Sequence, residues 1–192
     1  EAYRLFGIQP WESLAILERL YLRALISYPR TSSQKLPPAI NYKSILSKLA
    51  HRYKETANTA RSFPVEGPMD DPAHPAIYPT GELQPLSGNE FKLYDLVARR
   101  FIGAFYRNAR VAKKYMKVKA DEFDLEADGA ALIDKGWIEV YPFREIREKS
   151  IPDASVGEEV FIKDVKVDLA YTKPPSRYTP SSLLEWMESN EI

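Results

Sequence analysis

A tyrosine and an arginine on either side of a proline are the residues of this chain best suited to chemistry on a phosphate. They are Tyr28 and Arg30, in the segment LISYPRTSS at residues 25–33. A residue before proline is driven toward extended backbone, in which residues i and i+2 lie on the same side. We therefore expect the Tyr28 hydroxyl and the Arg30 guanidinium to face a common ligand.

An arginine in this position supplies what a tyrosine nucleophile lacks. A free tyrosine side chain has a pKa of about 10, so forming its phenolate at pH 7 costs about 4 kcal/mol. Nearby positive charge lowers that cost, and the planar guanidinium binds phosphate oxygens through two parallel hydrogen bonds. The tripeptide predicts a tyrosine that attacks phosphate; the alternative is an ordinary turn at the end of a helix.

Three blocks of sequence, found in the expected order, resemble the type IA DNA topoisomerases. The first is residues 1–33 (EAYRLFGIQPWESLAILERLYLRALISYPRTSS), where the family's tyrosine ends a helix and forms the covalent link to DNA. The second, HPAIYPT at residues 74–80, resembles the family's short histidine motif. The third, TKPPSRY at 172–178 with SSLLEWME at 181–188, resembles the segment past the tyrosine domain. Within the first block, the sequence LISYPR is most similar to the archaeal branch of the family.

The resemblance implies a reaction and assigns residues to it. Tyr28 would attack a backbone phosphate of single-stranded DNA, forming a 5'-phosphotyrosyl bond and releasing a 3'-hydroxyl, so that strand passage and religation relax negative supercoils. Arg30 would be the second catalytic residue, because charge builds on the phosphate oxygens in the transition state. No nucleotide is needed, since one phosphodiester replaces another. The DNA contacts expected near the tyrosine or from the motifs are His74, Thr31, Ser33 and Arg177.

The chain departs from the family pattern at three positions. Ser32 stands where many relatives have an aspartate, and Pro75 and Tyr78 replace acidic and basic residues of the histidine motif. The change at Ser32 removes a negative charge near Tyr28. The changes at Pro75 and Tyr78 remove charged residues with which His74 could interact.

The resemblance also implies Mg²⁺, bound elsewhere in the enzyme. The family's magnesium site is an Asp-x-Asp cluster with a glutamate and a lysine upstream, and this sequence has no such cluster. Its acidic pairs, Asp70-Asp71 and Glu158-Glu159, are adjacent residues in expected turns. We therefore expect no metal ligand here, and we interpret the chain as an excised part of the enzyme that binds DNA but does not cleave it alone. The remaining domains would be its partners, in a topoisomerase or the topoisomerase half of a reverse gyrase.

The distribution of charge along the chain is uneven, although the formal net charge is zero. Residues 99–119 contain eight basic residues and no acid, whereas residues 121–159 contain twelve acids and four bases. One interpretation is a basic surface along the DNA path; the other is that both runs are solvated faces. The residues of this run expected to contact DNA are Arg107, Arg110, Lys113 and Lys114.

Composition limits the class of protein. The chain has 192 residues, of which 44% are hydrophobic, enough for a buried core, and it has no cysteine. The absence of cysteine fits a reducing compartment. No apolar run approaches the roughly 20 residues that span a bilayer. We expect a cytoplasmic protein that is not inserted in a membrane.

Periodicity predicts an α+β chain. Apolar residues at helical spacing predict helices over residues 10–25, 42–53 and 88–105, the third preceded by a Ser87/Glu90 capping box. Residues 62–88 are rich in proline and glycine and predict little regular structure. Alternation predicts strands around 123–125 and over 137–141 and 160–171, and Thr179-Pro180 predicts a final helix start.

These elements suggest three modules: a helical module at 1–110, a β-rich module at 111–172, and the truncated start of a helical segment at 173–192. The resemblance implies that the first is a winged-helix-like gate domain bearing the tyrosine and the second its antiparallel support and hinge. Two alternatives remain: a non-catalytic winged-helix-like nucleic-acid-binding module, and a protein-interaction domain that uses the acidic β-rich module.

Overall fold

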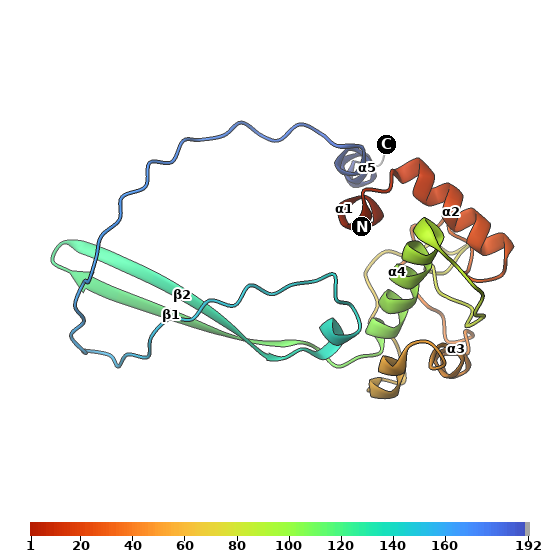
Figure 1. The fold of residues 1–192 in the computed structure, drawn as a ribbon, viewed down its shortest axis with the longest axis horizontal. Helices are drawn as coiled ribbons and strands as arrows, with labels where there is room; N and C mark the ends of the chain where they lie inside the picture. Colours follow the sequence, from red (N-terminus) through yellow and green to blue (C-terminus); the bar gives the residue numbers. More distant parts are fainter. Residues whose placement is uncertain (191–192) are drawn as a thin grey trace. The chain divides into compact units, whose positions relative to one another are not determined.

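The computed structural model describes residues 1–190, which form helices, one long antiparallel hairpin and a final helix (Figure 1). The α+β class predicted from the sequence is confirmed. The elements in chain order are α1 (Ala2–Phe6), α2 (Pro10–Leu22), α3 (Tyr42–Leu49), the 3-10 helix η1 (Lys54–Asn58), α4 (Gly88–Ala104), β1 (Arg110–Ala120), β2 (Phe123–Asp134), the 3-10 helix η2 (Gly136–Glu139) and α5 (Pro180–Ser189).

The chain divides into two compact units whose segments alternate along the sequence. The helical unit contains residues 1–109, residues 135–145 and the chain from Tyr178 onward. The hairpin unit contains residues 110–134 and 146–177. The three consecutive modules expected above are a different division, and they stay a prediction.

Helix α4 forms the centre of the core of the helical unit. It buries a stripe of apolar side chains, namely Leu93, Tyr94, Leu96, Ala98, Phe101 and Ile102. Helix α2 packs against α4 and adds Ile16 and Leu20, which are both almost completely buried. Burying one side chain of this kind stabilises the fold by about 1.5–3 kcal/mol. The core therefore fixes the position of α2, the helix that leads to Tyr28.

The starts of α2 and α5 follow local sequence signals, whereas the start of α4 differs from the prediction. Pro10 and Pro180 occupy first-turn positions as predicted, and Thr179 caps α5 by accepting a hydrogen bond from the backbone N–H of Ser182 at 3.1 Å. Helix α4 starts after Ser87, but the Ser87 side chain makes no capping hydrogen bond, so the predicted capping box is wrong. The Glu90 carboxylate, which a capping box would turn back to the Ser87 N–H, instead accepts hydrogen bonds from Arg19 at 3.1 Å and Arg23 at 3.0 Å.

The hairpin pairs the basic run with part of the acidic run. Strands β1 and β2 are antiparallel, and their register places Lys117 opposite Glu126 and Lys119 opposite Asp124. The Lys117–Glu126 pair is closed at 2.6 Å. The strand expected around residues 123–125 is confirmed as the start of β2.

Two predicted strands are wrong. Residues 137–141 form η2 and its end instead, because Trp137, Val140 and Tyr141 have the i, i+3, i+4 spacing of a helical turn, and the Tyr141 N–H donates to the Trp137 carbonyl at 3.2 Å. Residues 160–171 are exposed, and within residues 1–190 they make no backbone hydrogen bond. A strand needs a partner, and none of the described residues pairs with this segment. Residues 62–88 are largely irregular, as predicted.

No helix among residues 1–190 has both the length and the apolar character needed to cross a bilayer.

Candidate functional site

The chain leaves α2 through a tight turn that aims the next residues along an extended path. The Leu25 N–H donates to the Leu20 carbonyl at 3.0 Å, and the Ala24 N–H donates to the Tyr21 carbonyl at 2.8 Å. These two bonds form a Schellman motif, which normally has glycine at the left-handed position. Here that position is Ala24, with φ of 55°. The helix therefore ends at Leu22, three residues earlier than predicted.

The extended residues after this turn pair with the histidine motif. Ile26 and Pro79 form an isolated antiparallel bridge, and the Ser27 N–H donates to the Tyr78 carbonyl at 2.9 Å. The Ser27 hydroxyl in turn accepts from the Tyr78 N–H at 2.9 Å. Further along, the Ala76 N–H donates to the Lys35 carbonyl at 2.7 Å. Two of the three sequence blocks thus lie side by side.

Tyr28 lies at this junction, half-buried, with its ring against two others. The His74 ring centroid is 4.7 Å away at an interplanar angle of 45°. The Tyr21 ring from α2 makes an edge contact at 5.5 Å. The structure therefore brings the predicted residues Tyr28 and His74 together and adds Tyr21, which the sequence analysis missed.

Arg30 is exposed and binds a carboxylate from α2. Its Nε donates to Glu18 Oε1 at 2.7 Å, and its Nη2 lies 2.5 Å from the same oxygen. The Glu18 hydrogen bond is the main reason that the pKa of Arg30 is raised, and the Tyr28 side chain makes a smaller contribution in the same direction. Arg30 thus remains a cation close to Tyr28. Glu18 was missed too, because by its spacing it is an ordinary helix-surface residue.

Thr31 and Ser33 stabilise the segment that follows the tyrosine. The Thr31 hydroxyl donates to the His74 carbonyl at 3.4 Å and lies 3.5 Å from Asp71 Oδ2. It also accepts from the Ser33 N–H at 3.0 Å, and the Ser33 hydroxyl accepts from the Lys35 N–H at 3.1 Å. Thr31 and Ser33 thus stabilise the local backbone, and their contact with DNA stays a prediction.

The other residues expected to bind DNA lie in both units, and they differ in whether an acidic residue is their partner. Arg107 belongs to the helical unit and lies 3.5 Å from Glu139. In the hairpin unit, Arg110 is opposite Asp134 in the strand register, and Lys114 binds Asp153 and the Pro152 carbonyl. Lys113 and Arg177, also in that unit, are exposed and make no ion pair with any of the residues described.

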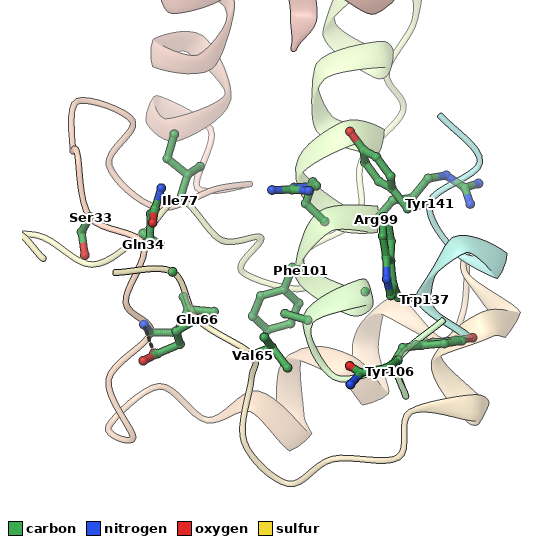
Figure 2. A pocket seen from close by; sticks show the side chains of 17 residues that line it. Ser33, Gln34, Val65, Glu66, Ile77, Arg99, Phe101, Tyr106, Trp137 and Tyr141 are labelled. Carbon is green, nitrogen blue, oxygen red and sulfur yellow. Dashed lines mark hydrogen bonds between the residues drawn. The ribbon is translucent and has the colours of Figure 1, made fainter. Parts of the chain in front are cut away.

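A pocket of about 520 Å³ lies in the helical unit, beside the residues that follow Tyr28 (Figure 2). Figure 2 shows Ser33 and Gln34 on one side and Trp137 and Tyr141 on the other, with Phe101 between them. Arg99, another lining residue, is already held by Asp95 at 2.8 Å and the Val140 carbonyl at 3.0 Å. The buried Ser33 therefore connects the tyrosine segment to this hollow.

Within residues 1–190, no group of three or more histidine, aspartate or glutamate side chains is close enough to share a metal ion. The described residues thus do not fit a Mg²⁺ site.

The chain is similar in sequence to known DNA topoisomerases. Residues 1–192 match the protein family described as DNA topoisomerase. The chain is 43% identical to the DNA topoisomerase 1 of Aeropyrum pernix, over 100% of this chain and 30% of that protein. It is 38% identical to the DNA topoisomerase 1 of Pyrococcus horikoshii, over 98% of this chain and 29% of that protein.

A solved structure has a similar fold. The full-length topoisomerase I of Thermotoga maritima matches with a TM-score of 0.70 at 21% identity, covering 98% of this chain and 33% of that chain. The chain thus spans about a third of that protein and about 30% of the curated relatives.

Proposed function

Because the chain belongs to the type IA DNA topoisomerase family, we propose that Tyr28 is the nucleophile with which the whole protein cleaves and rejoins single strands of DNA. The hydroxyl oxygen of Tyr28 attacks a backbone phosphorus, and the bond to the 3'-oxygen breaks. The products are a 5'-phosphotyrosyl link and a free 3'-hydroxyl. Attack by that hydroxyl on the same phosphorus reverses the step, so the reaction needs no nucleotide. Passing a strand through the opening relaxes negative supercoils.

The contact between Tyr28 and His74 is the observation that supports this proposal best. Both residues come from blocks that resemble the family's motifs, and their rings are 4.7 Å apart. A ligand bound at the Tyr28 hydroxyl is therefore within reach of the imidazole. We propose that His74 contacts the phosphate or its neighbouring sugar through a ring N–H, which is a donor suited to phosphate oxygens.

Arg30 is the cation proposed to stabilise the transition state. Negative charge grows on the phosphate oxygens during the transfer, so a positioned guanidinium lowers the barrier more than it strengthens ground-state binding. Its contact with Glu18 uses only part of the guanidinium, which leaves donors for the phosphate.

The remaining assignments are finer parts of the same proposal. Single-stranded DNA is the substrate, the other domains of the enzyme are partners, and Mg²⁺ belongs to those domains in a cytoplasmic protein. The helical unit would be a winged-helix-like gate and the hairpin its support. The proposed phosphate contacts beyond the tyrosine site are Thr31, Ser33, Arg107, Arg110, Lys113, Lys114 and Arg177.

A denaturing gel tests the proposal. The full-length protein, its Tyr28→Phe variant and the 192-residue chain are each incubated with end-labelled single-stranded DNA and Mg²⁺ and then denatured. Of these three proteins, only the unmodified full-length protein should form a labelled adduct. Tyr115→Phe, which changes an exposed tyrosine of β1, is the matched control and should form the adduct. An adduct with Tyr28→Phe would show that the nucleophile is another residue.

The same experiment separates the alternative of a non-catalytic nucleic-acid-binding module. That module would bind DNA in all variants and form no adduct in any. Its affinity would fall by about 0.7 log unit per log unit of salt for each phosphate contact on a single strand. Binding alone therefore does not distinguish the two functions, whereas the adduct does.

A further inference from the structure

We propose that Glu18 is a positioning residue for the cleavage reaction: it holds one edge of the Arg30 guanidinium so that the other end faces the phosphate beside Tyr28. This inference rests on the proposed function, because it takes Arg30 as the cation on the scissile phosphate. It extends that function to a residue of α2 that the sequence motifs did not single out.

The contact between the two side chains uses a particular edge of the guanidinium. Glu18 Oε1 accepts from Nε at 2.7 Å and lies 2.5 Å from Nη2. A guanidinium has five N–H donors in one rigid plane, and a phosphate is bound by two of them in parallel. Within residues 1–190, Nη1 of Arg30 makes no hydrogen bond. The end formed by Nη1 and the second N–H of Nη2 is therefore available to a phosphate.

Helix α2 orients both proposed catalytic residues from one face. Glu18 and Tyr21 are three residues apart, so their side chains project on the same side of the helix. Glu18 binds Arg30, and the Tyr21 ring contacts the Tyr28 ring at 5.5 Å. The helix is itself anchored in the core by Ile16 and Leu20. Helix α2 thus fixes the distance between the Tyr28 phenol and the Arg30 guanidinium. The extended segment that carries these two residues would not fix it alone.

Stability does not account for this ion pair. The side chains of Arg30 and Glu18 are 58% and 39% exposed, and pairs at such exposure add little to folding stability. An arginine side chain loses much rotational freedom when held in one orientation, and Glu18 imposes that restriction before DNA binds. The expected benefit is therefore in the rate of cleavage and not in the stability of the fold.

A double-mutant cycle in the full-length protein tests the assignment. The variants are Glu18→Ala, Glu18→Gln, Arg30→Ala and the Glu18→Ala/Arg30→Ala double variant, each measured for single-turnover cleavage and for DNA binding. We expect Glu18→Ala to slow cleavage about tenfold, because misplacing a catalytic group has effects of this size or larger. The DNA dissociation constant should change less than about twofold, since Glu18 does not touch DNA.

The other variants separate positioning from a general loss of structure. Glu18→Gln keeps an oxygen that can accept from Nε, so it should recover most of the rate. The double variant should be no slower than Arg30→Ala, because Glu18 acts only through Arg30. Glu12→Gln removes the same charge from the same helix, and its amide oxygen can still accept from Asn89. It should cleave at the unmodified rate.

Three results would overturn the inference: unchanged cleavage in Glu18→Ala, faster cleavage because Glu18 competes with the phosphate, or additive losses in the double variant. Each leaves the proposed function intact provided that Tyr28→Phe fails to form the adduct. An adduct with Tyr28→Phe would instead remove the proposed function itself.

Discussion

At the scale of single residues, the site depends on what holds Tyr28 and Arg30. Tyr28 contacts an imidazole from one segment and a phenol from another, and Arg30 binds Glu18. The expectation that Tyr28 and Arg30 would act on one ligand came from their i, i+2 spacing. The structure adds that each of them has its own partner on α2.

His74 can be tested apart from its ring contact. His74→Ala removes both the ring and the N–H donor, and we expect cleavage by the full-length protein to fall about 100-fold, as for the loss of one transition-state donor. His74→Phe keeps a ring against Tyr28 but has no donor, so it should be as slow as His74→Ala. Single-turnover cleavage rates measure both.

His51 provides the control, because it is exposed and lies in the turn after α3. His51→Ala should cleave at the unmodified rate. Recovery of the rate by His74→Phe would mean that His74 serves only to pack against Tyr28, and the proposed DNA contact would be wrong.

At the scale of elements, the turn after α2 determines where the tyrosine segment begins. Ala24 adopts a left-handed conformation at a position where glycine is usual. For a residue with a side chain this conformation costs about 1–2 kcal/mol, partly offset in a glycine variant by its more flexible unfolded chain. We therefore expect Ala24→Gly to raise the free energy of unfolding by about 0.5–1 kcal/mol, measured by urea denaturation.

A second alanine-to-glycine change tests whether conformation is the cause. Ala15 lies inside α2, where glycine costs about 1 kcal/mol relative to alanine. Ala15→Gly should therefore lower the free energy of unfolding. Equal effects of the two substitutions would contradict the strain assigned to Ala24.

Local patterns predicted most helices but only part of the site. Apolar periodicity and proline positions predicted α2, α3 and α4, because each buries one face in the same core, although α2 and α3 end before the predicted residues 25 and 53. The alternation at 160–171 gives the order of apolar and polar side chains, but it does not specify a second strand to pair with. The strand prediction for this segment was therefore wrong. The sequence at 137–141 alternates between apolar and polar residues in part, but the side chains that it buries have helical spacing.

Local sequence patterns do not predict the contact between Tyr28 and His74. The two residues are far apart in sequence, and His74 lies in the largely irregular segment 62–88, so no periodicity relates them. Resemblance to known motifs identified both residues individually. Their juxtaposition comes from backbone pairing around Ser27 and Tyr78, which depends on the whole core.

At the scale of the whole molecule, basic residues of the uneven charge distribution lie next to acidic residues of the hairpin unit. The hairpin register places lysines of β1 opposite acids of β2, and Lys117 and Lys114 both bind carboxylates. These lysines of the basic run thus have acidic partners within the hairpin unit, and the choice between a DNA-binding surface and solvated faces stays a prediction. Lys113 and Lys119 are exposed lysines of β1 that make no ion pair with the described residues.

The core of the helical unit predicts how stability changes at high pH. Tyr94 is 1% exposed, and burial raises its pKa to about 12. In the unfolded chain the same phenol loses its proton near pH 10. Between about pH 10 and 12 the unfolded state therefore binds fewer protons than the folded state, and stability falls as pH rises. The contribution of Tyr94 is fully present below pH 10.

Tyr94→Phe should reduce this dependence. The free energy of unfolding, measured in urea at several pH values, should decline less steeply between pH 10 and 12 than in the unmodified chain. Tyr171→Phe, at a site that is 85% exposed, should leave the slope unchanged. Identical slopes for all three proteins would contradict the assignment of this effect to the buried phenol.

In the proposed reaction, Tyr28 becomes covalently attached to DNA. The most direct measurement is to trap the adduct of the full-length protein with single-stranded DNA, digest it with nuclease and protease, and locate the remaining nucleotide by tandem mass spectrometry. We predict a nucleotide joined through its 5'-phosphate to the oxygen of Tyr28. A nucleotide on any other residue, or one joined through its 3'-phosphate, would contradict the account.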